Sequence, residues 1–191
     1  YTTLFRSSFV KKNPEAFGSC AALVESEFTK NGYHVPYVYR KGDQLLESDL
    51  GDPGYGYQTF DWYTLPRDLQ RPVWSEPYYD EDGGGVLMVT YSVPVYASHD
   101  RDRFLGVVTC DVSLTWLTAL LNELQLGQGG YAFLVSANGT FICHTLRPGF
   151  IMNETLFSIA EAKDSTLLRN VGRQMLRRQS GFLKMIGIAN N

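Results

Sequence analysis

The alternation of apolar and polar residues is clearest in the middle of the chain, where it predicts an antiparallel sheet. Two β-branched runs, at 86–96 and 104–112, are joined by a short charged loop and favour a central hairpin. A shorter alternating run at 33–40 is followed by Lys41-Gly42-Asp43, which predicts a second hairpin leading into 44–47. Strands therefore form the expected framework of the first two thirds of the chain.

Helical signals lie between and after these strands. Asn13-Pro14-Glu15 combines an N-cap residue, a proline at the first helical position and an acid in the first turn, which predicts a helix within 14–28. Leucines at helical spacing predict an amphipathic helix over 114–124, with either Asp111 or Ser113 as its N-cap. A glycine-rich and aromatic stretch at 49–85 predicts long functional loops around one short helix near Trp62.

A second series of elements begins after Gly130. It consists of a strand at 131–135, an Asn138-Gly139 turn, a strand at 140–143, helices near 154–162 and 165–178, and a new strand at 181–182. We therefore expect an α+β protein with two modules, each an antiparallel sheet flanked by helices. The first covers 1–124, and the second covers 125–191 and is incomplete.

Composition narrows the function. The chain has 191 residues, 44% hydrophobic and 19% charged, with a net charge of -3, which is typical of a globular protein. The absence of long Lys/Arg runs argues against binding to nucleic acid or to an anionic membrane surface. No stretch approaches the roughly 18 apolar residues that cross a bilayer. Because the chain opens at Tyr1, we expect a piece of a longer protein with membrane segments at its flanks.

The residues that carry chemistry in enzymes and metal sites are few and scattered. Cys20, Cys110 and Cys143 form no CxxC pair, which argues against a zinc site or a disulfide framework and leaves a single Cys110–Cys143 bridge open. The three histidines, His34, His99 and His144, are scattered along the chain, and no nucleophile or phosphate-loop motif occurs. We expect no cofactor, no metal and no catalysis.

Aromatic residues and carboxylates concentrate between 60 and 111, and their order predicts one small-molecule pocket. Aromatic faces and carboxylates together suit a ligand with a cationic or hydrogen-bond-donating end. The candidate ligand-binding residues are Trp62, Tyr63, Trp74, Glu76, Tyr78, Asp80, Tyr91 and Asp111.

Taken together, five segments resemble a double Cache sensor domain, which consists of two tandem PAS-like modules. They are DWY at 61–63, WSEPYYD at 74–80, YSVPV at 91–95, GVVTCDVSL at 106–114 and GGYAFLVSANGTFICH at 129–144. The resemblance implies an extracytoplasmic sensor domain of a prokaryotic transmembrane receptor, of the histidine kinase, phosphatase or chemoreceptor type. It also implies a membrane-distal ligand-binding module, a membrane-proximal one, and a long N-terminal helix, mostly missing here, through which a homodimer forms.

The amino-acid-binding members of that family are similar to this chain at Trp62-Tyr63, at Tyr78-Tyr79-Asp80 and at Asp111. Phe60 stands where those members carry an arginine, and this puts carboxylate recognition by the usual mode in doubt. Arg67 or Arg71 could replace that arginine from the same loop. The expected ligand is an amine or an amino-acid-like molecule.

Two other functions stay open on the sequence. The chain could be a ligand-free dimerisation domain of a membrane receptor, in which case Trp62 and Asp80 only support structure. It could also be a metal-dependent hydrolase that uses Asp80, Glu81 and Asp82.

Overall fold

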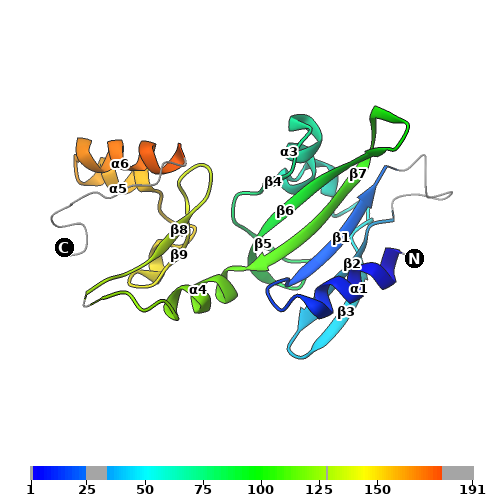
Figure 1. Cartoon of the computed structure of the whole chain (residues 1–191), viewed down its shortest axis with the longest axis horizontal. Coiled ribbons are helices and arrows are strands. Elements are labelled where there is room, and N and C mark those ends of the chain that lie inside the picture. The colour runs from blue at the N-terminus through cyan, green and yellow to red at the C-terminus, as the bar shows by residue number, and fades with distance from the viewer. Residues whose placement is uncertain (1, 25–33, 128, 178–191) are drawn as a thin grey trace.

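The computed structural model describes residues 2–24, 34–127 and 129–177. Its larger part is a seven-stranded antiparallel sheet with the order β3-β2-β1-β7-β6-β4, in which β5 also pairs with β6 (Figure 1). The strands are β1 (Gly18–Leu23), β2 (Pro36–Lys41), β3 (Gln44–Asp49), β4 (Val73–Trp74), β5 (Tyr78–Asp80), β6 (Val86–Ala97) and β7 (Asp100–Ser113). The predicted central hairpin is confirmed as β6 and β7, and the hairpin turn at Lys41-Gly42-Asp43 is confirmed between β2 and β3.

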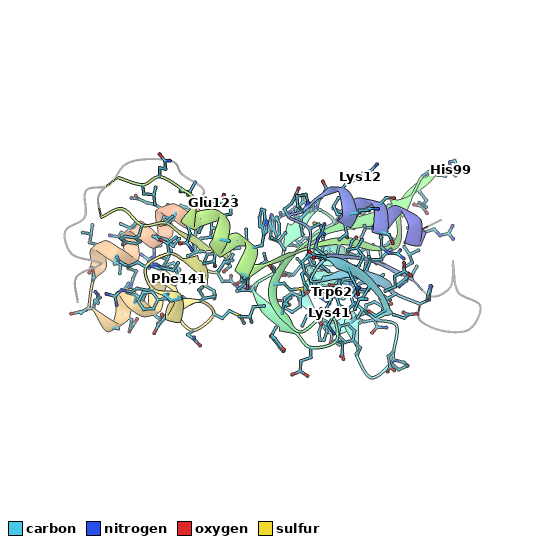
Figure 2. The ribbon with its side chains drawn as sticks, turned by 90° about the horizontal axis from the view of Figure 1, so that it is seen from below. Lys12, Lys41, Trp62, His99, Glu123 and Phe141 are labelled. Carbon is cyan, nitrogen blue, oxygen red and sulfur yellow. The ribbon has the colours of Figure 1, made fainter. Side chains whose placement is uncertain are left out.

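Helices complete this part of the molecule. α1 (Thr2–Lys12) packs against β1 and β2, and α3 (Asp61–Leu69) follows the 3-10 helix η1 (Tyr57–Thr59) and packs against β6 and β7. Aromatic rings from the η1–α3 region pack on the small residues of β1, and Figure 2 shows Trp62 within the interior of this part. Tyr57 stacks on Trp62 with ring centroids 5.9 Å apart. The short helix predicted near Trp62 is therefore confirmed as α3.

The smaller part follows α4 (Leu114–Asn122), which leads from the end of β7 toward a two-stranded sheet of β8 (Phe133–Val135) and β9 (Phe141–His144) (Figure 1). The 3-10 helix η2 (Pro148–Phe150) and the helices α5 (Leu156–Ala162) and α6 (Thr166–Leu176) complete it. Its core packs Phe141 against Leu156, Ile159 and Leu168. The predicted hairpin and both predicted helices are confirmed, whereas the strand expected at 181–182 lies outside the described residues.

The structure corrects one sequence-based expectation and settles two that the sequence left open. The helix expected within 14–28 is wrong, because α1 ends before Asn13 and the buried strand β1 begins at Gly18. Ser113 is the N-cap of α4, since its side chain accepts a hydrogen bond from the Trp116 N–H. The Cys110–Cys143 bridge left open above does not form, because both cysteines are free.

The α+β fold class is confirmed. Within the part of the chain that the structure describes, every helix is too short or too polar to cross a bilayer.

Candidate ligand-binding site

A cavity of about 550 Å³ opens between the start of α3 and the short strand β5. Tyr55 lines it from the loop before η1, and Phe60 and Trp62 line it from the start of α3. The opposite wall is the segment that joins β4 to β5 and continues beyond β5, with Glu76, Tyr78 and other residues through 82. The cavity is thus built by three segments that lie between residues 54 and 82.

A break in the edge of the sheet creates that wall. β4 and β5 both pair with β6, and the regular strand pairing stops after Trp74 and resumes at Tyr78. Pro77 has no N–H to donate, which disfavours a continuous strand. Just before it, the Ser75 N–H donates to the Thr90 carbonyl at 2.9 Å, and the Ser75 hydroxyl accepts a hydrogen bond from the Thr90 N–H at 3.0 Å. The outward step places Glu76, Pro77 and Tyr78 in the cavity lining.

Asp80 is the buried acid of this cavity, with only 6% of the residue exposed. Its Oδ1 accepts the Gly83 N–H at 2.8 Å and the Tyr55 hydroxyl at 3.2 Å. Burial raises the pKa of Asp80 and the charge of Asp82 adds to the rise, while the hydrogen bonds from Gly83 and Tyr55 oppose it. Asp80 is part of the cavity lining, and a cation placed in the cavity would favour its ionised form.

Asp111 lies one layer deeper than Asp80. It is 4% exposed and lines a small inner space of about 10 Å³, which Tyr55, Trp62, Tyr78 and Asp80 separate from the main cavity. Burial raises the pKa of Asp111 to about 6 and the Asp80 charge adds to this, while hydrogen bonds from Thr90 and Tyr37 oppose it. The inner space holds at most one water, so it is too small to admit a ligand beside Asp111.

The hydroxyl groups around Asp111 form a chain with a defined direction. The Thr90 Oγ1 donates to Asp111 Oδ1 at 2.9 Å and lies 2.8 Å from the Tyr78 hydroxyl. Because a threonine hydroxyl has a single proton, the Tyr78 hydroxyl donates to Thr90, and Thr90 donates to Asp111. The ring of Tyr78, which lines the main cavity, is thereby linked to the buried carboxylate.

The predicted site residues fall into three groups. Trp62, Glu76, Tyr78 and Asp80 line the main cavity, and Asp111 lies directly behind it. The remaining three lie outside the lining. They are Tyr63, which packs edge-on against Tyr57 in the core, and Trp74 and Tyr91, whose rings contact each other with centroids 5.0 Å apart.

Sequence reasoning missed Tyr55, which lines the main cavity, the inner space and a third cavity of about 410 Å³ beside it. Its ring packs edge-on against Phe60 at 5.0 Å, and its hydroxyl bonds Asp80. An aromatic residue placed between Gly54 and Gly56 was the available signal, because such a ring in a glycine-rich loop needs a surface to pack on.

The arginines proposed as a substitute at position 60 lie elsewhere. Arg67 pairs with Asp68 at 2.7 Å and covers the Tyr63 ring at 5.8 Å, and neither Arg67 nor Arg71 is in the lining of the main cavity. Across the described residues, no three His, Cys, Asp or Glu side chains are arranged to hold a metal ion. The site as built suits non-covalent binding of a small molecule.

A second, apolar groove of about 420 Å³ lies between the two parts of the molecule. Trp74 and Ser75 contribute to it from the larger part, and Leu134 and Met175 from the smaller. Beside it, the Asn138 N–H donates to Glu76 Oε1 at 3.2 Å. The segment that walls the ligand cavity therefore also contacts the β8–β9 turn.

The chain belongs to the family described as methyl-accepting chemotaxis protein-like, first PDC sensor domain, whose family model matches residues 3–119. The predicted resemblance to Cache-type sensor domains is thereby confirmed.

Individual relatives agree with this assignment. The chain is 32% identical over 124 residues to the methyl-accepting chemotaxis protein McpA of Pseudomonas putida, covering 64% of this chain and 19% of that receptor. Among solved structures, it is similar to the extracellular domain of a protein assigned as a histidine kinase, soHK1S-Z6, with 28% identity and a TM-score of 0.67 over 88% of this chain and 62% of that one.

A ligand-bound structure is also similar. It is the ligand-binding domain of the Pseudomonas aeruginosa amino-acid chemoreceptor PctC in complex with GABA, with 27% identity and a TM-score of 0.54 over 81% of this chain and 58% of that one. The chain thus spans less than two thirds of each of these three relatives.

Proposed function

We propose that this chain is the extracytoplasmic sensor portion of a transmembrane signal-transduction receptor and that its ligand binds in the cavity beside Trp62 and Asp80. The observation that carries the proposal is a 550 Å³ cavity in which aromatic rings surround a buried carboxylate. Membership of the chemoreceptor sensor family supports it, and so does the likeness to the extracellular domain of a protein assigned as a histidine kinase. The output is of the histidine kinase, phosphatase or chemoreceptor type.

The proposed ligand is an amine or an amino-acid-like molecule. Asp80 faces its cationic group, while Trp62 and Tyr78 contact its apolar part, as cation–π and carboxylate interactions require. Asp111 acts through Thr90 and Tyr78. The GABA complex of PctC supports this class, because GABA is amino-acid-like and carries both an amine and a carboxylate.

The proposed organisation has two modules. Residues 1–124 form the membrane-distal ligand-binding module, and 125–191 belong to the membrane-proximal one. Both the position of α4 between the two sheets and the match of the family model to 3–119 support this division. In the full-length receptor we place a homodimer contact at the N-terminal helix and membrane segments at the flanks.

We propose that the chain works by binding alone, without chemistry. Ligand binding favours one arrangement of loops and helices over another, and the signal is the difference in affinity between those two arrangements. The family assignment to receptor sensor domains supports this mode of action.

A thermal-shift screen tests the proposal. Amines, amino acids, carboxylates and nucleobases are added to the wild-type chain and to the Asp80→Asn and Asp68→Asn variants. A ligand at 100 times its Kd stabilises the folded state by about 2.7 kcal/mol, which gives a readily measured rise in Tm. We expect one class to stabilise the wild type and Asp68→Asn but not Asp80→Asn. If no compound raises the Tm, or if the same compound raises the Tm of the wild type and of Asp80→Asn equally, the proposed site is contradicted.

A further inference from the structure

The charge of the cavity lining is entirely of one sign. Its ionisable carboxylates are Asp61, Glu76, Asp80, Glu81 and Asp82. The inner space adds Asp111, and the cavity beside Tyr55 adds Asp49 and Asp52. Within the described part of the chain, none of these three cavities is lined by a Lys, Arg or His side chain. From this we infer that the ligand is an organic cation that carries no carboxylate group. The inference rests on the proposed function and narrows its ligand class.

Two arginines of the larger part, Arg67 and Arg40, are engaged outside the main cavity. Arg67 pairs with Asp68 and covers the Tyr63 ring, and it is not in the lining of the main cavity. Arg40 donates from its Nε to the Ala16 carbonyl at 2.9 Å, outside the cavity lining. A ligand carboxylate would therefore lose its hydration without gaining a charged partner, which is strongly unfavourable in a partly buried site.

The remaining feature that attracts anions is the N-terminus of α3, where free backbone N–H groups and the helix dipole favour negative charge. A negative charge already lies at this position. Asp61 is the first residue of the helix and lines the cavity, so its carboxylate supplies a negative charge at the place where a ligand carboxylate would bind. A second carboxylate there meets like-charge repulsion.

The buried pair of acids favours the opposite sign. Asp80 and Asp111 are both less than 10% exposed, and the charge of Asp80 raises the pKa of Asp111. A cation beside Asp80 lowers that cost for both carboxylates. The aromatic walls at Phe60, Trp62 and Tyr78 accept an apolar or aromatic body attached to the cation.

Pairs of ligands that differ only in the carboxylate provide the experiment. Cadaverine is compared with lysine, agmatine with arginine, and phenethylamine with phenylalanine, by isothermal titration of the wild-type chain. Charge-assisted hydrogen bonds left unmade on a buried group correspond to about 10- to 100-fold in affinity. We expect at least one amine to bind about 10-fold or more tightly than its parent amino acid.

A charge-reversal variant tests the cause of this discrimination. Asp61→Lys places a base in the lining and should bring the affinity ratio of amine to amino acid toward one. Asp68→Lys makes the same change in net charge away from the cavity, and it should leave the ratio unchanged. Both variants keep an exposed position on α3, and their Tm values report whether they fold.

The outcomes are distinct. Binding of an amino acid as tight as that of its amine overturns the inference and leaves the sensor proposal intact, and so does binding of carboxylates or nucleobases but no amine. An equal shift of the ratio in Asp61→Lys and Asp68→Lys overturns the role of the lining charge. A panel in which no compound of any class binds counts against both the inference and the proposed function.

Discussion

Replacing Asp111 with asparagine should change how the stability of the protein depends on pH. The side chain is almost fully buried, and its pKa is about 6 in the folded chain against an ordinary value of 3.8. The folded state therefore binds this proton more tightly than the unfolded state does. The stability that the neutral form allows is fully present below pH 3.8, and it is lost as pH rises toward and through about 6.

The size of the effect follows from the difference between the two pKa values, since one pH unit corresponds to 1.36 kcal/mol. The charged Asp111 carboxylate thus makes the folded state about 3 kcal/mol less stable at pH 7 than it would be with a neutral side chain. In Asp111→Asn this component is removed. The free energy of unfolding of the variant, relative to wild type, should rise by about 2 kcal/mol between pH 4, where the unfolded carboxyl is already partly ionised, and pH 7.

Urea unfolding at intervals of half a pH unit measures the free energy of unfolding of each protein. Subtracting the wild-type value from that of the variant cancels the contributions of most other titrating groups. Asp68→Asn is the matched control, because this exposed acid has its pKa lowered by the Arg67 guanidinium. Its difference curve should not rise with pH. A flat or falling curve for Asp111→Asn would refute the claim that this carboxylate is buried without an answering cation.

Two further substitutions test the surrounding structure. Gly106→Ala should destabilise the fold by about 3 kcal/mol, because φ is +142° and the new Cβ would lie 2.2 Å from a backbone carbonyl oxygen of β1. Gly42→Ala is the control. Its φ is +60° and the space around it is open, so the substitution should cost only about 1 kcal/mol in the same urea titration. Thr90→Val keeps the shape but removes the hydrogen bond to Asp111, so the pKa of that acid should move further above 6 and stability at pH 7 should fall by about 1–3 kcal/mol. An unchanged pH midpoint in Thr90→Val would mean that the hydroxyl does not hold the carboxylate.

Local signals were sufficient for the turns and hairpins. Lys41-Gly42-Asp43 and Asn138-Gly139 combine residues that adopt positive φ with flanking alternation, and Gly42 and Gly139 have φ values of 60° and 87°. The helix predicted within 14–28 was wrong because this segment lacks such local signals. β1 is buried along nearly its whole length, so it carries no alternation, and Asn13-Pro14 follows a helix instead of starting one. For short buried runs of this kind, tertiary contacts determine whether a strand or a helix forms.

The site was predicted only in part, because its residues play different structural roles. Trp62 and Asp80 stood out as an aromatic residue and an acid in a functional loop, and both line the cavity. Trp74 has the same composition signal, yet 52% of it is exposed and it lines the groove between the two sheets. Tyr55 went unnoticed because its importance comes from lying at the junction of three cavities, which a linear sequence does not display.

Ser75 and its neighbours form a partition only one residue thick. Ser75 lines the ligand cavity on one side and the apolar groove on the other, and Glu76 next to it holds the β8–β9 turn through Asn138. A molecule that pushes this partition outward must change the shape of the groove, and a repacking of the groove must narrow or widen the cavity. Mechanical communication between the two sheets can therefore run through a few atoms, without a rigid-body movement of either sheet.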